Sequence, residues 1–141
     1  MASGDSDSQL IASLLVHDAE ITTLSSDGES NIPLQEVLGE TESFRAQLIL
    51  SIDIATDGEC VMEATGRTPA DTPIVSVTAR RCSGGDRMAV TGVASTPVLV
   101  DSENPTVSLQ PSSDFRGDSE YRMHLVKILA SRALDSLNGE K

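Results

Sequence analysis

Alternation of apolar and polar residues divides the middle of the chain into short extended stretches. It recurs over residues 47–54, 59–65, 74–81 and 87–93. A period of two is typical of β-strands that bury one face. Asp57–Gly58 and residues 83–86 have the composition of tight turns, which join consecutive strands into hairpins. We therefore predict one antiparallel sheet of three to four strands, with residues 97–100 as a short edge strand.

Near the C-terminus, a spacing of three and four residues between apolar positions replaces the alternation. This pattern predicts a helix over residues 119–137, with Asp118 as its N-cap. Tyr121 and Leu125 are assigned to the apolar stripe that would cover the sheet. Truncating either of them to Ala is expected to cost roughly 2–4 kcal/mol, and truncating Arg122 far less.

Two smaller elements precede the sheet. Apolar residues recur at helical spacing from Leu10 to Val16. A helix this short is stable only if it packs against another part of the protein. Residues 19–24 and 30–34 are predicted to form a hairpin, with Pro33 confining the second strand to an edge. Together these patterns predict an α+β fold: an antiparallel sheet packed against a C-terminal helix, plus an N-terminal helix and a small hairpin.

The composition narrows the classes of partner. The 141 residues suffice for one domain, and 22 acidic residues against ten Lys and Arg give a net charge of −12. This balance argues against a nucleic-acid partner. No apolar run approaches the roughly 18 residues that a membrane span needs. No secretion signal is recognised at the N-terminus, so we expect no membrane partner and a cytoplasmic location.

Residues suited to catalysis are few. Neither His17 nor His124 stands in a motif that pairs a nucleophile with a base, so no catalytic residue is predicted. Cys60 and Cys82 lack a CxxC motif and are expected to be buried, reduced thiols rather than metal ligands or a disulfide. Arg80–Arg81 is either an anion-binding pair or, as we prefer, a solvated strand end.

Two segments differ from simple connections between elements. The loop Gly66 to Pro73, GRTPADTP, is longer and richer in proline than a hairpin requires, and such loops often contact a ligand or a partner. Asp114 to Arg122 crowds acidic, basic and aromatic residues into nine positions. Helix capping and local salt bridges explain most of this crowding, and contact with another chain is the alternative.

These C-terminal segments resemble a known family. AVTGVASTPVLV followed by SSDFRGDSEYRMHLVKILASRAL is similar to the C-terminal domain of the flavoprotein medium subunit of molybdenum hydroxylases, the carbon monoxide dehydrogenase and xanthine dehydrogenase family. The family pattern G-V-x-x-T-P-V is kept from Gly92 to Val98. Most of a second family pattern, D-I-R-A-S-x-E-Y-R-R-H-L, is kept by Asp114, Arg116 and residues 120–125. Upstream, LILSIDI resembles the strand that leaves the family's flavin domain, and DAEITTLSSDGESNIPLQEVL resembles that domain's final hairpin.

The chain also departs from the family pattern. The Gly-rich loops of AGGT and TIGG type, which hold FAD in the family's N-terminal domain, do not occur in this sequence. The helical sequence that family members carry between T-P-V and D-I-R is shortened here to the residues between Val100 and Asp114. The resemblance therefore implies two parts: residues 1–46 as a remnant of the end of a flavin-binding domain, and residues 47–141 as a domain like the C-terminal domain of the carbon monoxide dehydrogenase flavoprotein.

The resemblance also implies a function. The chain would be a non-catalytic part of an FAD-dependent oxidoreductase, helping to close the FAD site and to dock the electron-transfer complex. FAD is expected only in a complete subunit, with none tightly bound to this chain. By resemblance, five residues occupy positions that approach FAD: Asp7, Ile49, Thr68, Asp71 and Ile74.

The implied partners are a flavin-binding N-terminal domain and the molybdopterin and iron–sulfur subunits. The alternative is an independent small binding or dimerisation domain without a redox role. An apolar patch on the exposed side of the Leu10–Val16 helix would favour the first function, because the stub of a missing domain leaves surface unburied.

Overall fold

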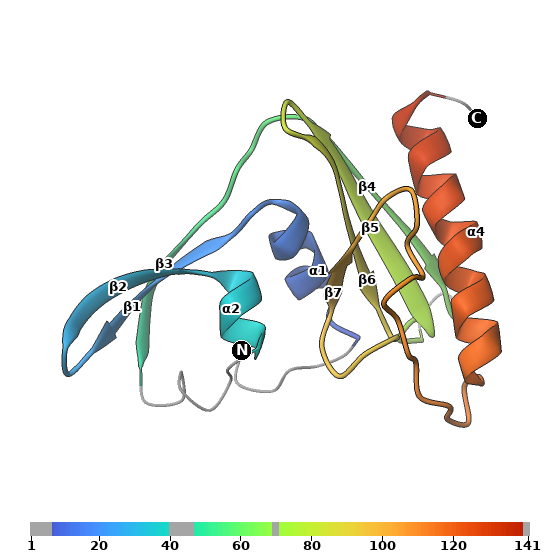
Figure 1. Ribbon diagram of the computed structural model, residues 1–141, viewed down its shortest axis with the longest axis horizontal. Helices are drawn as coiled ribbons and strands as arrows, with labels where there is room; N and C mark the ends of the chain where they lie inside the picture. The colour runs from blue at the N-terminus through green and yellow to red at the C-terminus, as the bar shows by residue number, and fades with distance from the viewer. Residues whose placement is uncertain (1–6, 40–46, 69–70, 140–141) are drawn as a thin grey trace.

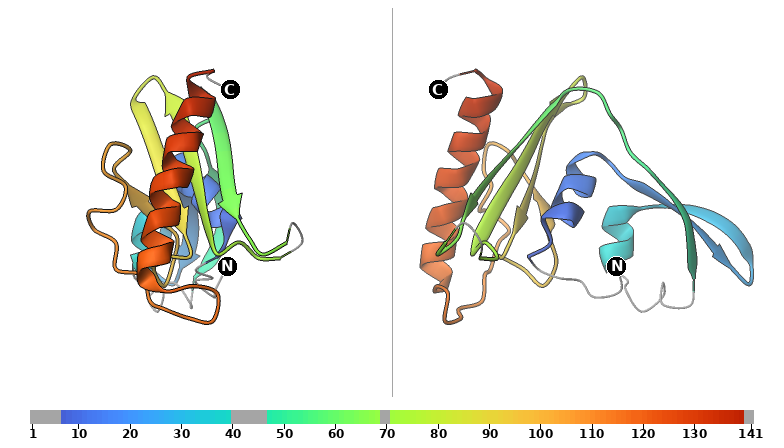
Figure 2. Two further views of the ribbon diagram at one scale, coloured as in Figure 1. Left: turned by 90° about the vertical axis from the view of Figure 1, so that its right-hand side faces the viewer. Right: turned by 180° about the vertical axis from the view of Figure 1, so that it is seen from behind.

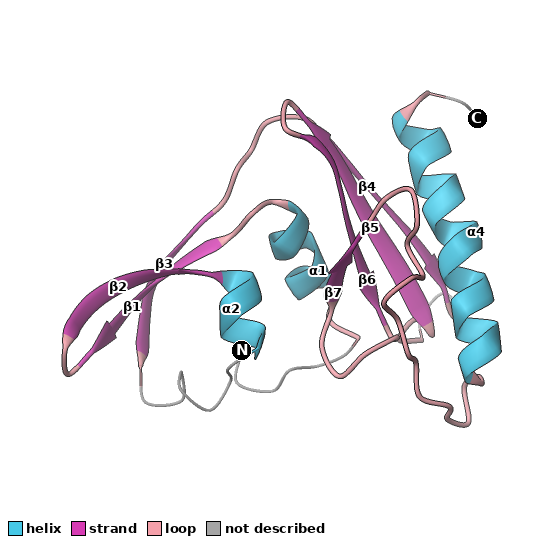
Figure 3. Cartoon of the chain, in the orientation of Figure 1, coloured by secondary structure: helices cyan, strands magenta, loops and turns pink. Residues whose placement is uncertain are grey.

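The computed structural model of the chain describes residues 7–39, 47–68 and 71–139 and has the predicted α+β fold (Figure 1). In the described residues the strands form two antiparallel sheets, with strand orders β2-β1-β3 and β4-β5-β6-β7 (Figure 3). In chain order the elements are α1 (Gln9–Val16), β1 (Glu20–Ser25), β2 (Gly28–Pro33), α2 (Leu34–Gly39), β3 (Leu48–Asp53), β4 (Glu59–Thr65), β5 (Val75–Cys82), β6 (Gly85–Thr91), β7 (Val98–Val100) and α4 (Ser119–Leu137).

The four-stranded sheet is covered on both faces. α4 packs on β4 and β5 from one side, and α1 packs on β5, β6 and β7 from the other (Figure 2). The three-stranded sheet extends away from this layered unit, with α1 and α2 between the two sheets (Figure 1). The predicted sheet, C-terminal helix, N-terminal helix and hairpin are therefore all present.

Two apolar cores form on the two faces of the four-stranded sheet. The larger one joins the α4 side of β5 and β6 to α4: Ile74, Val75, Val77, Ala79, Met88, Val90, Val93, Leu109, Leu125, Val126, Leu129, Ala130, Ala133 and Leu137. The smaller one joins α1 to β1, α2 and β6: Ile11, Ala12, Leu15, Val16, Ala19, Ile21, Leu34 and Ala89. The short helix thus obtains the docking surface that its length requires.

α4 begins at the predicted residue, but the side chain that it turns toward the sheet is that of Arg122 rather than Tyr121. The Asp118 carboxylate caps it by accepting a hydrogen bond from the Tyr121 N–H at 2.7 Å. Leu125 is buried, as predicted, but Tyr121 is 42% exposed and Arg122 only 3% exposed. The assignment of Tyr121 to the buried stripe is therefore wrong, because the helix instead turns Arg122 inward. There Arg122 Nη1 donates to the carbonyl oxygens of Ile74 at 3.0 Å and Gly92 at 2.6 Å.

β3 does not join the sheet to which the sequence pattern assigned it. It pairs antiparallel with β1, so residues 47–54 belong to the sheet of the N-terminal hairpin. The chain then crosses to β4 through residues 54–58, with the Ala55 N–H donating to His17 O at 2.9 Å. Gly58 is needed not for a hairpin but because its backbone, with φ of 85°, approaches the carbonyl of Arg81 too closely for a Cβ.

Arg80 lies between β5 and α1 rather than in solvent. It is 1% exposed, and its Nη1 donates to the Val16 carbonyl at the end of α1 at 3.0 Å. Its Nη2 bonds the Asp57 carboxylate at 2.5 Å, in the crossing between the sheets. The solvated strand end expected for Arg80 is therefore wrong, because α1 covers this face of β5. The side chain of Arg81, by contrast, is 41% exposed and pairs with Asp86 at 2.8 Å.

The two cysteines are free thiols, but they are not buried as expected. Cys60 is exposed and Cys82 partly buried. Cys60 lies on the face of β4 opposite the one that contacts α4, and α1 packs on the other three strands of the sheet. Partial burial still raises the pKa of the Cys60 thiol.

Candidate functional site

The loop between β4 and β5 forms one side of a small pocket. The Ile74 N–H donates to Thr65 O at 2.7 Å and closes the base of the loop, and the Asp71 N–H donates to Thr68 O at 3.1 Å. Residues 69 and 70 of this loop lie outside the described residues. The pocket has a volume of about 330 Å³ and is lined by Arg67, Asp71, Thr72, Ile74, Phe115 and Arg116.

Arg116 brings Asp7 to this pocket. Its Nη1 donates to Asp7 Oδ2 at 2.8 Å, and its Nε donates to Asp114 Oδ2 at 3.2 Å. The hydrogen bond to Asp7 is the main cause that raises the pKa of Arg116. Beside the pocket, Arg116 therefore links the N-terminal end of the described chain to the segment before α4.

Asp114 is the centre of the charged cluster that precedes α4. Its Oδ1 accepts hydrogen bonds from Arg122 Nη2 at 2.6 Å and from the Arg116 N–H at 2.8 Å. The hydrogen bond from Arg122 is the main reason that the pKa of Asp114 lies well below its usual range, and desolvation opposes it. The crowding seen in the sequence is thus a capping and salt-bridge network, as predicted.

Phe115 and Arg67 form the outer rim of the pocket. Phe115 is 83% exposed, and the guanidinium carbon of Arg67 lies 6.0 Å from the centre of its ring. This distance is at the limit of a cation–π contact, so the pair contributes little on its own. It leaves an apolar ring and a cation at the protein surface.

Four of the five residues predicted to approach FAD lie in or beside this pocket. Asp71 and Ile74 line it, Thr68 is hydrogen-bonded to Asp71 through the backbone, and Asp7 is held by Arg116. Ile49 does not line the pocket, because it belongs to β3 in the other sheet, where it is 42% exposed. An approach of these residues to FAD stays a prediction.

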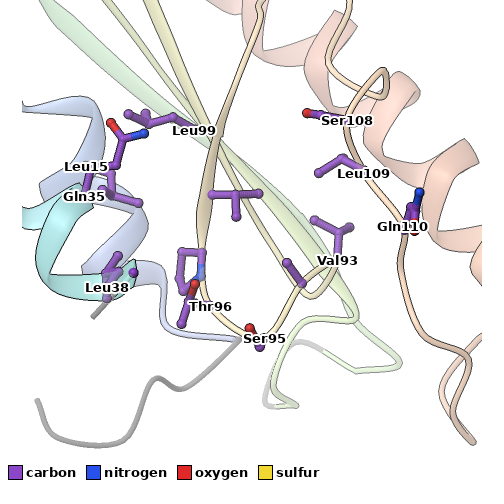
Figure 4. A pocket seen from close by; sticks show the side chains of 14 residues that line it. Leu15, Gln35, Leu38, Val93, Ser95, Thr96, Leu99, Ser108, Leu109 and Gln110 are labelled. Carbon is purple, nitrogen blue, oxygen red and sulfur yellow. The ribbon is translucent and has the colours of Figure 1, made fainter. Parts of the chain in front are cut away.

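A larger groove of about 620 Å³ lies where α1 and α2 face the segment leading into β7 (Figure 4). Figure 4 shows Leu15, Gln35 and Leu38 on one side of that segment, with Ser108 and Leu109 on the other. None of the lining residues carries an ionisable side chain: Leu15, Gln35, Leu38, Gly39, Val93, Ala94, Ser95, Thr96, Pro97, Val98, Leu99, Ser108, Leu109 and Gln110. The groove therefore offers hydroxyl and amide groups but no acid–base chemistry.

The described residues hold no group of three or more His, Cys, Asp or Glu side chains placed to bind a metal ion. Among the helices that the structure describes, none is long and apolar enough to cross a membrane.

The sequence pattern did not reveal the two buried arginines that join distant segments, Arg80 and Arg122. A signal for Arg122 was available, because residues 122, 125, 126 and 129 follow the same helical spacing as the buried residues of α4. For Arg80 the signal was indirect. A helix as short as α1 needs a docking surface, and β5 could supply it only if both of its faces were buried.

Comparison with solved structures shows similar folds. Quinoline 2-oxidoreductase from Pseudomonas putida 86 matches with a TM-score of 0.78 and 17% identity. Carbon monoxide dehydrogenase from Hydrogenophaga pseudoflava matches with 0.80 and 18%, and CO dehydrogenase from Oligotropha carboxidovorans with 0.79 and 19%. Each match covers 99% of this chain and 59% of the solved chain.

No protein-family model matches the sequence, and neither does any curated protein. The chain spans 59% of the length of the solved chains that it matches, so it shares the fold of a part of them. The resemblance to carbon monoxide dehydrogenase that the motifs predicted is therefore confirmed at the level of the fold.

Proposed function

We propose that this chain is a non-catalytic domain of a molybdenum hydroxylase flavin subunit that helps to close an FAD site and to dock the electron-transfer complex. Its partners would be a flavin-binding domain and the molybdopterin and iron–sulfur subunits of a cytoplasmic oxidoreductase. Residues 1–46 would be the end of the flavin-binding domain and residues 47–141 the C-terminal domain. Because β3 pairs with β1, the three-stranded sheet would connect these two parts.

One observation carries this proposal: in the part of the chain that the structure describes, several large apolar side chains are left uncovered on α1, on the three-stranded sheet and directly after β3. A monomeric protein rarely leaves so many together without a partner. Leu10, on the outer side of α1, is 68% exposed, which is the feature expected of the stub of a larger domain. The others are Leu24, Leu48, Ile49, Leu50, Ile52 and Ile54, with exposed fractions of 37–62%.

The pocket beside the β4–β5 loop does not by itself fit a whole flavin dinucleotide. Its volume of about 330 Å³ is at the lower end of the range of roughly 300–1,000 Å³ typical of small-molecule sites. One of its two cations is also engaged, since Arg116 already holds Asp7 and Asp114. The residues therefore suit one wall of an FAD site, completed by a second domain, and the chain alone is expected not to retain FAD.

Binding measurements with and without a second domain test the proposal. We expect no stoichiometric FAD in the purified chain, and no binding at micromolar FAD, which would require roughly 8 kcal/mol. A flavin-binding domain of this family from the same organism should associate with the chain and hold FAD more tightly in the complex than alone. Arg67→Gln should reduce that gain, whereas Arg132→Gln, on the exposed side of α4, should not. Stoichiometric FAD in the isolated chain, or no association, would overturn the proposal.

The same exposed surface also supports the second candidate, an independent binding or dimerisation domain without a redox role. The two candidates differ in what occupies that surface. Association with the flavin-binding domain, and a change in FAD affinity, are expected only for the first.

A further inference from the structure

Phe115 is an aromatic side chain that the fold holds in solvent beside the pocket of the β4–β5 loop. It is 83% exposed and lines that pocket together with Arg67, Asp71 and Ile74, among others. The sequence has only two Phe, one Tyr and no Trp, so one of its few aromatic rings is left outside the core. Single exposed apolar residues are common on protein surfaces, and exposure alone assigns no role to Phe115. The role follows instead from how the ring is held and from what surrounds it.

A tight turn presents the Phe115 ring. The Asp114 N–H donates to Gly117 O at 3.1 Å, and the Gly117 N–H donates to Asp114 O at 3.2 Å. The Asp114 carboxylate also accepts hydrogen bonds from the N–H groups of Arg116 at 2.8 Å and Gly117 at 3.2 Å. A Cβ at Gly117 would lie 2.8 Å from the Tyr121 ring, so that ring packs closely against the turn. Phe115 is therefore exposed on a backbone that is already held in place, and a ligand that packs on it does not have to order the segment.

Beside the ring lies a cation that pairs with no carboxylate among the described residues. The Arg67 guanidinium lies over the Phe115 ring, 6.0 Å from its centre. The other cation of the pocket, Arg116, is held by Asp7 and Asp114. A free cation next to an open aromatic ring suits a ligand that carries both a planar ring and an anionic group. FAD carries both, in its two ring systems and its pyrophosphate.

We propose that Phe115 is a binding residue for FAD, against whose exposed ring one of the planar rings of the dinucleotide packs. This inference rests on the proposed function, because the remaining walls of the site would come from the flavin-binding domain. It goes beyond that function by assigning a contact to a residue outside the β4–β5 loop and by giving its chemical nature. Stacking on an aromatic side chain is tolerant of the polar groups at the edge of the ligand ring, so Phe115 suits both the isoalloxazine and the adenine.

Titration of FAD into the complex of the full chain with a flavin-binding domain of this family tests the inference. Phe115→Leu keeps an apolar side chain but removes the ring, and should raise the dissociation constant of FAD about tenfold. Phe115→Tyr keeps the ring and should bind FAD as wild type does. Val107→Ala is the matched control, because Val107 is also 83% exposed but does not line the pocket. It should leave the affinity for FAD unchanged.

Titration with FMN identifies which ring packs on Phe115. FMN carries the isoalloxazine but not the adenine. A loss of affinity confined to FAD in Phe115→Leu would therefore assign Phe115 to the adenine, and an equal loss for FAD and FMN would assign it to the isoalloxazine. The visible absorption of the bound flavin gives an independent readout, since it should differ between wild type and Phe115→Leu only when the isoalloxazine packs on the ring.

Association of the two proteins without FAD separates this inference from the proposed function. Phe115→Leu should melt like wild type and leave the dissociation constant of the FAD-free complex unchanged, because its contact is with the cofactor. Equal weakening of the FAD-free complex and of FAD binding would make Phe115 a contact between the proteins and overturn the inference. Unchanged FAD affinity in Phe115→Leu would overturn it too, whereas the proposed function would stand as long as the wild-type complex forms and holds FAD. A wild-type chain that does not associate with the flavin-binding domain would overturn both.

Discussion

Arg122 connects three segments that are far apart in the chain. Its guanidinium donates to the carbonyls of Ile74 and Gly92, at the ends of two stretches of the sheet, and to the Asp114 carboxylate before α4. A carbonyl that is buried without a donor costs free energy comparable to a lost hydrogen bond. Arg122 therefore stabilises the ends of β5 and β6 as well as the start of the helix.

We expect Arg122→Ala to lower the free energy of unfolding by about 2–4 kcal/mol, because the buried Ile74 carbonyl and the partly buried Gly92 carbonyl lose a donor and Asp114 loses its partner. Tyr121→Ala should cost about 1 kcal/mol or less, since its ring is largely exposed. Chemical denaturation of both variants measures the difference. Arg122→Lys should recover only part of the loss, because an ammonium group cannot bond all three acceptors from one position. A larger loss for Tyr121→Ala would contradict this arrangement of α4.

Asp114 should make stability dependent on acid pH. Because the folded state lowers its pKa, chiefly through the hydrogen bond from Arg122, its stabilisation is fully present above the ordinary aspartate pKa of about 3.9. It is lost as the pH falls below that value toward the lower pKa of the folded state. Asp114→Asn should therefore reduce the melting temperature at neutral pH and flatten its decline in acid.

Asp57 and Asp86 also have lowered pKa values and contribute to the same decline. For this reason the informative quantity is the difference between wild type and Asp114→Asn across the acidic range. Parallel curves for the two proteins would show that Asp114 is not stabilised as described.

At the scale of elements, Arg80 on β5 hydrogen-bonds both to α1 and to the segment 54–58 that connects the two sheets. It bonds the Val16 carbonyl, the carbonyl of Asp57 and the Asp57 carboxylate. His17 Nδ1 reinforces the same junction by donating to Ala55 O at 2.7 Å. The position of the three-stranded sheet relative to the four-stranded sheet is thus held by polar contacts beside the smaller core.

Arg80→Met should destabilise the chain by about 2–4 kcal/mol, because the buried Val16 carbonyl loses its donor and Asp57 loses its partner, while the apolar volume is largely kept. Arg81→Met is the neighbouring control. It removes a partly exposed salt bridge with Asp86 and exposed or partly buried hydrogen bonds to Leu137 O and Asn138 Oδ1 at the end of α4, and is expected to cost about 1 kcal/mol, less than Arg80→Met. Urea denaturation compares the two, and similar losses would mean that Arg80 does not hold the junction.

The docking of α1 predicts that truncating two leucines of the same helix has different effects on stability. Leu15 is 3% exposed in the smaller core, whereas Leu10 is 68% exposed on the same helix. Leu15→Ala should cost about 2–4 kcal/mol through lost burial and the cavity that it leaves. Leu10→Ala should change stability by no more than about 0.5 kcal/mol. Thermal melts at low protein concentration measure both, and a destabilised Leu10→Ala would show that α1 packs on its other side.

At the scale of the whole molecule, the two sheets should differ in local stability. The four-stranded sheet is covered by α4 and α1, whereas every residue of β3 in the three-stranded sheet is exposed. Amide exchange of the dilute protein should therefore be slowest in β5 and β6 and fastest in β3. Equal protection in β3 and β5 would contradict the layered arrangement.

Local patterns in the sequence determined most of the elements. The alternation over residues 59–65, 74–81 and 87–93 predicted β4, β5 and β6, and the capping residue Asp118 predicted the start of α4. These features depend on neighbours in the chain, so sequence spacing is sufficient to find them. The six-residue helix α2 was missed because it is too short to show a helical period.

The candidate site was predicted only in part. Asp71 and Ile74 were placed by resemblance, and the structure puts them in one pocket with Arg116. Arg67 and Phe115 lie in the two segments that the sequence singled out, Gly66 to Pro73 and Asp114 to Arg122. That these segments meet was not predicted, because the two residues are nearly 50 positions apart and no local pattern reports the contact.

Only the tertiary structure decided which sheet β3 joins and which polar residues are buried. The alternation of β3 is the same whether it pairs with β4 or with β1, because a period of two reports the faces of a strand and not its partner. Similarly, the burial of Arg80 depends on α1, and that of Arg122 on the carbonyls of Ile74 and Gly92. The sequence by itself determined the elements and their amphipathic faces, and long-range packing decided how those faces were used.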